Sequence, residues 1–152
     1  MKLKQLFESM PTSKQEVEAI LNRYDITNYI INNDLSVDVD GDVNLYNQNL
    51  TNIPAKFGNV SGYFDCSYNQ LSSLRGALRE VGGGFYCTSN KLTSLEGSPR
   101  EVGGNFWCNK NSLASLKGAP REVGGNFDCS DNKITALYGI GHVGGQIISD
   151  LT

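Results

Sequence analysis

The chain has 152 residues and carries 13 Lys and Arg against 16 Asp and Glu, which gives a net charge of −3. This length suits one domain with a continuous core, and so weak a charge argues against general affinity for nucleic acid or anionic lipid and against a charge-based mimic of DNA. The first residues lack the apolar segment of a secretory signal, and the chain has no run of about eighteen apolar residues, so we expect a soluble, cytoplasmic protein.

Residues 1–38 are expected to form a cap at the amino-terminal end. Ser13 and Glu16 have the spacing of a capping box, which predicts a helix over about residues 14–24. Apolar side chains then follow at the helical intervals i, i+3, i+4 and i+7, at Val17, Ile20, Leu21 and Tyr24. Upstream of Pro11, one more helical turn is suggested by Leu3, Leu6 and Phe7.

A hairpin is predicted next, over about residues 28–39. Two strand-forming segments, residues 28–31 and 35–39, flank the turn-forming sequence Asn32-Asn33-Asp34. The cap should mainly shield the first layer of the core, because the terminal units of a stacked array need a polar outer face. The alternative is that it docks a partner or dimerises.

Residues 39–142 consist of five repeats. Val60, Val81, Val102 and Val123 follow one another at intervals of 21 residues, a weaker copy begins at Val39, and a truncated sixth unit covers residues 143–152. A unit this short cannot bury its own apolar face, so neighbouring units must stack into a solenoid. We expect the cap and all the units to form one structural domain.

Each unit is numbered here from its Val, which is position 0. Every full unit from residue 60 onward has Phe at position 4, Cys at 6, Asn at 9, Leu or Ile at 11 and Leu at 14. The alternation at positions 4 and 6 predicts a short strand whose positions 3, 5 and 7 face the opposite side. The Asn side chains should form a ladder of hydrogen bonds to the backbone of their own and neighbouring units.

The return arm of each unit should be extended rather than helical. Gly occupies position 16 in every full unit from residue 60 onward, and Pro99 and Pro120 occupy position 18, which excludes a regular helix and favours an array of little curvature. Positions 19 and 20 carry Arg and Glu three times over. We expect these pairs to form a mixed ion-pair ladder on a solvated face rather than a basic stripe for nucleic acid; they are Arg79-Glu80, Arg100-Glu101 and Arg121-Glu122.

The four cysteines are expected to be reduced and buried. All of them occupy position 6, where Leu45 stands in the first unit; they are Cys66, Cys87, Cys108 and Cys129. Strands stacked about 4.8 Å apart would line these thiols up in the core, instead of converging on one ion. Metal-binding and redox roles remain the alternatives.

Chemistry-bearing motifs are otherwise absent from the sequence. His142 is the only histidine and has no nucleophile or acid ordered beside it in sequence, so we expect a surface residue. Repeated pairs such as Gly103-Gly104 lead into strands and lack the Lys and Ser/Thr of a phosphate-binding loop, so close packing of the arms explains them better. We therefore predict no catalytic, cofactor-binding or metal-binding residue.

The outward positions 3, 5, 7 and 8 vary between units where the core positions do not. Folding should place Tyr86 and Trp107 side by side at mid-array, with Tyr46 among the flanking aromatic residues. Exposed aromatic side chains in a polar surround are typical of an interface, although they could also stack only to stabilise the sheet. The candidate partner-binding residues are Tyr63, Asp65, Tyr68, Tyr86, Thr88, Asn105, Trp107, Asn109, Lys110, Asn126, Asp128 and Asp131.

The pattern Phe-x-Cys-x-x-Asn-x-Leu-x-x-Leu, as it stands from Phe85 to Leu95, resembles the leucine-rich repeat, whose motif is Leu-x-Leu-x-x-Asn-x-Leu. The resemblance covers roughly residues 39–150. The short Gly- and Pro-bearing arm is similar to that of the bacterial class of leucine-rich repeats. The sequence pattern Leu-x-Gly-x-Pro-x-Glu-Val-Gly-Gly-x-Phe is similar to that of uncharacterised bacteriophage repeat proteins. The resemblance implies an α/β-type solenoid that is predominantly β, with short parallel strands and extended, non-helical return arms behind the helix-and-hairpin cap.

The leading functional hypothesis is a non-enzymatic protein-binding module. Its concave sheet would grip a protein partner through Tyr86 and Trp107, and the aspartates around them would favour a basic or polar patch. The phage resemblance suggests a host or defence factor as the target, in the host cytoplasm. The alternatives are a structural or self-assembling protein, associating through its C-terminal edge strand or its cap, and capture of a small molecule or nucleotide at Tyr86 and Trp107.

Overall fold

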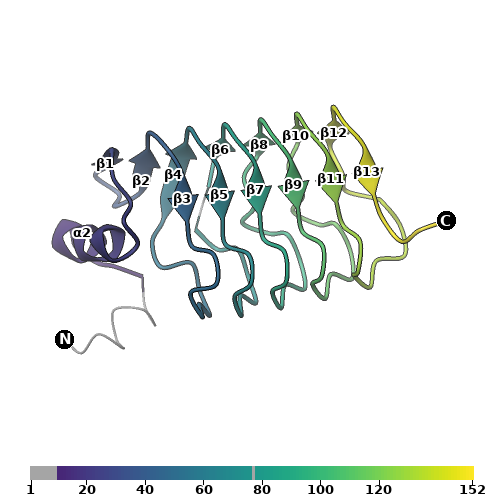
Figure 1. The fold of residues 1–152 in the computed structure, drawn as a ribbon, viewed down its shortest axis with the longest axis horizontal. Coiled ribbons are helices and arrows are strands. Elements are labelled where there is room, and N and C mark those ends of the chain that lie inside the picture. The colour runs from purple at the N-terminus through teal and green to yellow at the C-terminus, as the bar shows by residue number, and fades with distance from the viewer. Residues whose placement is uncertain (1–9, 77) are drawn as a thin grey trace.

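The computed structural model describes residues 10–76 and 78–152, and it shows a β-solenoid of about five turns with a repeat of about 21 residues. The turns stack side by side in an almost straight row, with the helix at one end and the C-terminus at the other (Figure 1). The helical turn expected at Leu3, Leu6 and Phe7 lies outside the described residues. Within the described ranges, no helix is long and apolar enough to cross a membrane.

The helix α2 (Lys14–Arg23) begins at the predicted N-cap. The Ser13 hydroxyl accepts a hydrogen bond from the Glu16 N–H at 3.2 Å, and the Glu16 carboxylate in turn accepts from the Thr12 N–H at 2.6 Å. The side chains that α2 buries against the first turn are Val17, Ile20 and Leu21. The helix therefore covers the amino-terminal end of the core, as the capping-box spacing predicts.

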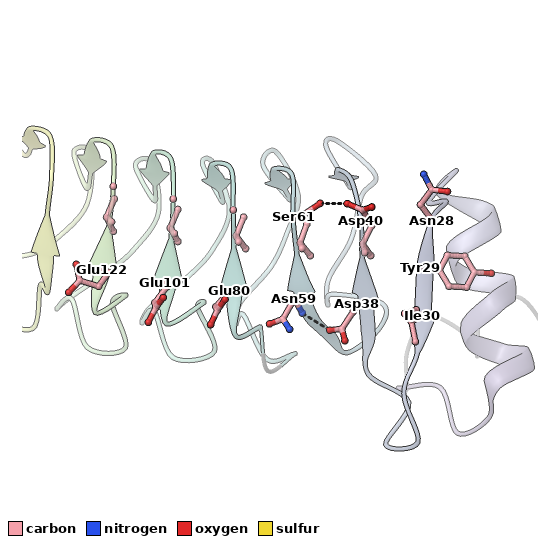
Figure 2. Close-up of a pocket in the computed structure, with 18 of the residues that line it drawn as sticks. Asn28, Tyr29, Ile30, Asp38, Asp40, Asn59, Ser61, Glu80, Glu101 and Glu122 are labelled. Atoms are coloured by element: carbon pink, nitrogen blue, oxygen red, sulfur yellow. Dashed lines mark hydrogen bonds between the residues drawn. The ribbon is translucent and has the colours of Figure 1, made fainter.

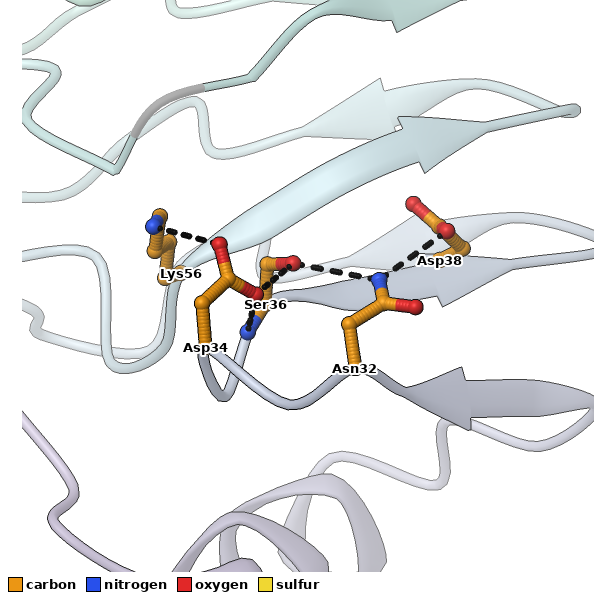
Figure 3. A network of polar contacts seen from close by, with 5 residues as sticks. All are labelled: Asn32, Asp34, Ser36, Asp38 and Lys56. Carbon is orange, nitrogen blue, oxygen red and sulfur yellow. Dashed lines mark hydrogen bonds and ion pairs between the residues drawn. The ribbon is translucent and has the colours of Figure 1, made fainter.

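The predicted hairpin is also present, as β1 (Tyr29–Ile31) paired antiparallel with β2 (Val37–Val39). Its turn is held by the polar network in Figure 3. Asp34 accepts hydrogen bonds from the Ser36 hydroxyl at 2.6 Å and from Lys56 at 2.9 Å, while Asn32 donates to Ser36 and to Asp38. These hydrogen bonds, from Ser36 first and then Lys56, hold the pKa of Asp34 well below its usual value.

The repeats build two parallel sheets in the described part of the chain. Sheet A continues from β1 and β2 through β4 (Phe57–Val60), β6 (Glu80–Val81), β8 (Glu101–Val102), β10 (Glu122–Val123) and β12 (His142–Val143). Sheet B is formed by β3 (Val43–Asn44), β5 (Phe64–Asp65), β7 (Phe85–Tyr86), β9 (Phe106–Trp107), β11 (Phe127–Asp128) and β13 (Ile147–Ile148). Sheet B is the predicted strand stack.

Sheet A shows that the extended return arm is more ordered than the sequence pattern indicated. Its Val residues at position 0 form a core column that the sequence analysis did not assign, with Val81, Val102 and Val123 each no more than 2% exposed. Position 0 was missed because only two residues of each arm from residue 80 onward pair in the sheet, too few to produce an alternating pattern.

Phenylalanine side chains stack along the core from turn to turn. Phe64, Phe85, Phe106 and Phe127 have ring centroids 5.4, 5.4 and 5.1 Å apart along the column, with interplanar angles between 11° and 19°. Each of the four is fully buried. The near-identical spacing keeps successive turns in register and so fixes the geometry of the outward positions.

The asparagine ladder forms as predicted. Asn111 donates through Nδ2 to the carbonyls of Cys87, Cys108 and Asn109, at 3.0, 3.1 and 3.3 Å, and its Oδ1 accepts from the Leu92 N–H at 3.0 Å. Asn90 and Asn132 repeat this arrangement one turn away on either side. Each Asn therefore satisfies backbone groups of its own turn and of the turn before it.

All four cysteines are free and buried. Each thiol lies within hydrogen-bond distance of a carbonyl on the following turn, as in the 3.3 Å contact from Cys108 Sγ to the Asp128 carbonyl. Burial, the largest cause, raises the pKa of every one of them, to about 11 for Cys129. The thiols therefore act as small protonated core residues, as predicted.

Candidate partner-binding surface

The outer face of sheet B carries a continuous row of position-5 residues. In-register pairing places Asp65 beside Tyr86, Tyr86 beside Trp107, and Trp107 beside Asp128. The Tyr86 and Trp107 rings are in contact, with centroids 4.9 Å apart and planes tilted by 55°. Trp107 remains 40% exposed. The predicted aromatic pair thus exists, and it is bracketed by one carboxylate at each end.

A hollow of about 370 Å³ lies over this row. A second ring pair borders it, Tyr46 and Tyr68, with centroids 5.3 Å apart. Of the twelve predicted residues, the hollow is lined by Asp65, Tyr68, Tyr86, Thr88, Trp107, Asn109, Lys110 and Asp128, and it adds Tyr46 and Ser67. Four of the twelve do not line it: Tyr63, Asn105, Asn126 and Asp131.

Position 3 forms a second polar ladder that sequence reasoning did not anticipate. The Asp42 carboxylate accepts from the Tyr63 N–H, the Asn105 amide oxygen from the Asn126 N–H, and the Asn126 amide oxygen from the Gln146 N–H, each at 2.9 Å. Asn105 and Asn126, which were predicted to bind a partner, therefore hold backbone donors of the next turn.

This position-3 ladder is interrupted at the aromatic pair. Tyr63 and Gly84 stand there and supply no acceptor, so in the described part of the chain neither the Gly84 N–H nor the Asn105 N–H has a hydrogen-bond acceptor. The Tyr86 hydroxyl occupies the space that a side chain on Gly84 would fill. The gap thus accommodates the Tyr86 ring, and it leaves the N–H of buried Gly84 and the N–H of half-buried Asn105 without an acceptor among the described residues. The only sequence signal was a Gly where the next two units have Asn.

The position-8 residues lie where the chain turns out of sheet B. Tyr68, Ser89, Lys110 and Asp131 all have left-handed backbone conformations, with φ between 53° and 57°. Lys110 and Tyr68 border the hollow, whereas the Asp131 N–H donates to the Asp150 carboxylate near the C-terminus. A residue at position 8 other than Gly, Asn or Asp therefore carries a conformational cost.

Sheet A presents a different and larger surface, a shallow groove of about 1110 Å³. Figure 2 shows Glu80, Glu101 and Glu122 in a row along it, with Asp38 and Asp40 toward the cap. The prediction of an Arg–Glu ion-pair ladder is wrong. Within the described residues, none of Arg79, Arg100 and Arg121 forms an ion pair.

In-register parallel pairing explains why that ladder does not form. It places each Glu beside the Glu of the next turn, as in Glu80 beside Glu101 and Glu101 beside Glu122. The Arg that precedes each Glu along the strand projects to the opposite side of the chain. The last member of the row is His142, whose exposed ring lies 3.1 Å from the Glu122 carboxylate, consistent with the predicted surface position.

The paired glycines pack as predicted. The Gly124 N–H and Gly125 N–H bond to the turn before them, and a Cβ on Gly124 would overlap the Gly103 carbonyl. Backbone approach this close leaves no room for a phosphate between the arms. In the ranges 10–76 and 78–152, no group of three or more His, Cys, Asp or Glu side chains is arranged to hold a metal ion.

The electrostatics of the sheet B face are set by its carboxylates. Burial first, and then the charges of Asp42 and Asp65, raise the pKa of Tyr63. Asp65 also contributes to the raised pKa of Cys66 beneath it. The carboxylates of Asp42 and Asp65 therefore place negative charge beside the first half of the aromatic row.

Comparison with protein-family models, with curated proteins and with solved structures finds no match in any of the three.

Proposed function

We propose that the chain is a non-enzymatic protein-binding module that recognises its partner with the outer face of sheet B. The observation that carries this proposal is the Tyr86–Trp107 ring pair, with centroids 4.9 Å apart and with Trp107 40% exposed. Large rigid aromatic side chains of this kind supply much of the binding energy at protein interfaces.

Packing of the sheet does not account for this exposure. The solenoid already has a fully buried column of phenylalanines that joins the same turns. The N–H of Asn105, which is half-buried and has no acceptor among the described residues, supports a polypeptide partner in particular, because main-chain carbonyls are the acceptors that every polypeptide offers.

We also propose that the chain is related to leucine-rich-repeat proteins, and in particular to those of bacteriophages. This relationship is supported by the repeated Phe-x-Cys-x-x-Asn-x-Leu pattern and by the Asn ladder that the pattern produces. On this proposal the partner is a host or defence protein, met in the cytoplasm of a bacterial host.

Affinity capture from a bacterial host lysate tests the proposal. The wild-type chain and a Tyr138→Ala control should recover the same protein, and a Tyr86→Ala/Trp107→Ala variant should not. Tyr138 is the matched control because it is 87% exposed and does not line the hollow. The recovered protein should then bind the purified wild-type chain directly. Equal recovery by all three chains would overturn the proposal.

A further inference from the structure

The hollow on sheet B combines aromatic faces with carboxylates in one small space. Asp65 lies in register beside Tyr86, and the hollow that contains both is also bordered by the Tyr46–Tyr68 ring pair. At the other end of the row, Asp128 lies beside Trp107. Four rings and two carboxylates therefore face one volume of about 370 Å³.

The two carboxylates are held in place but keep bonding capacity. Asp65 Oδ1 accepts from the Ser67 N–H at 2.9 Å, and Asp128 Oδ1 accepts from the Ser130 N–H at 3.0 Å and from its hydroxyl at 2.6 Å. Among the described residues, the Oδ2 atoms of Asp65 and Asp128 have no hydrogen-bond donor, and neither residue forms an ion pair. Each side chain is thus oriented by its own turn, with one oxygen left for a ligand.

The charge of the hollow is not balanced from within. Its lining includes one cationic residue, Lys110, which is exposed and, within the described ranges, makes no ion pair. Two carboxylates against one ammonium leave a net negative charge beside the aromatic faces. Such a surface complements a cation that can also stack.

A guanidinium group meets both requirements better than an ammonium group. It is planar, stacks on aromatic faces, is weakly hydrated and donates several hydrogen bonds to a carboxylate, whereas a lysine ammonium is strongly hydrated and compact. We propose that the hollow receives an arginine side chain of the protein partner, with the guanidinium paired to Asp65 and stacked against Tyr86 and Trp107. This inference rests on the proposed function and names the chemistry of its partner.

A fluorescence titration tests the inference directly, because Trp107 is the only tryptophan in the chain. The probes are three terminally blocked hexapeptides, of arginine, lysine and citrulline, titrated at physiological salt. Arginine should bind and change the Trp107 emission, lysine should bind at least about threefold more weakly, and neutral citrulline, which has nearly the same shape, should not bind.

The decisive variant is Asp65→Asn, which should weaken arginine binding about fivefold. Its fold should be preserved, because Asn44 occupies the equivalent position in the first unit and accepts the same kind of hydrogen bond, from the Tyr46 N–H at 3.1 Å. The matched control is Glu101→Gln, which removes one charge from the exposed row on sheet A and should leave binding unchanged.

Several outcomes would overturn the inference. Equal weakening by Asp65→Asn and Glu101→Gln would mean nonspecific attraction to an acidic protein, and equal binding of arginine and lysine would mean that stacking plays no part. Absence of arginine binding, or a Trp107 response to a neutral oligosaccharide such as cellohexaose instead, would also overturn it. If the capture experiment still recovers a partner through Tyr86 and Trp107, the proposed function stands without this inference.

Discussion

The hydroxyl of Tyr86 lies over Gly84, in the space that a side chain on residue 84 would occupy. Tyr86 and Gly84 belong to positions 5 and 3 of the same unit, and the missing side chain at position 3 lets the ring fold down onto the sheet. The same Gly breaks the polar ladder of its column. One residue choice thus both creates room for an aromatic side chain and leaves the Asn105 N–H without an acceptor among the described residues.

Replacing Gly84 by Asn should repair the ladder and displace Tyr86. The new amide oxygen would accept from the Asn105 N–H, as Asn105 does for Asn126, and that hydrogen bond contributes about 1 kcal/mol, enough to offset the lost ring contact. The free energy of unfolding should therefore stay within about 1 kcal/mol of wild type, while Trp107 emission shifts and partner binding is lost.

Gly84→Ala serves as the control, because it displaces the ring without supplying an acceptor. It should change the Trp107 emission in the same way but give a lower free energy of unfolding than Gly84→Asn. A crystal structure of Gly84→Asn with Tyr86 unmoved would contradict this prediction.

Asn111→Ala should destabilise the fold by about 2–3 kcal/mol in denaturant unfolding, because it removes four hydrogen bonds and leaves the Leu92 N–H without an acceptor. Asn52→Ala is the matched control: Asn52 is exposed, its amide makes one 3.4 Å contact with Thr51, and its loss should cost less than about 0.5 kcal/mol. Similar losses in the two variants would show that the ladder adds nothing to stability.

Stability should fall as the pH rises above about 9. A buried thiol whose pKa is raised on folding keeps its proton in the folded state after the unfolded chain has lost it. Ionisation therefore stabilises the unfolded state relative to the folded state. The contribution is fully present below the unfolded pKa and is lost through the folded pKa, which is about 11 for Cys129. Between these values each cysteine should lower the free energy of unfolding by about 1.4 kcal/mol per pH unit.

The difference between wild type and Cys108→Ala isolates one thiol from the other titrating groups. Urea unfolding at pH 7, 9 and 10 should give a shallower pH dependence for the variant. Identical slopes would contradict burial of the Cys108 thiol in its protonated form.

Ser89→Gly should stabilise the protein by about 1 kcal/mol, because Ser89 has a φ of 55° and glycine adopts that conformation without the clash of a Cβ. Ser72→Gly is the control, since Ser72 is exposed but does not have positive φ, and there the added backbone freedom should destabilise. Thermal unfolding of both variants measures the difference, and a lower melting temperature for Ser89→Gly would contradict it.

Much of this architecture could be predicted from the sequence because stacking makes the same demand at every turn. Phe106 and Cys108 recur at fixed positions since each must fill a slot between identical neighbours, and Asn111 recurs since each turn leaves the same backbone groups unpaired. The cap was predictable for a local reason: the Ser13 hydroxyl accepts a hydrogen bond from the Glu16 N–H in the first turn of α2, only three residues away. The outward direction of Trp107 followed from simple alternation with the buried Phe106.

Sheet A, the failed ion-pair ladder and the gap at Gly84 depend on contacts between turns. Whether Arg100 meets Glu80 or Glu101 is decided by the register of neighbouring strands, and that register placed glutamates together. The role of Gly84 depends on where the ring of Tyr86 comes to rest and on what the next turn needs from position 3. The sequence by itself determined the repeat, its core columns and the face on which Tyr86 and Trp107 lie. Only the tertiary structure decided which side chains at position 3 are engaged with the backbone, because those hydrogen bonds join residues about 21 positions apart.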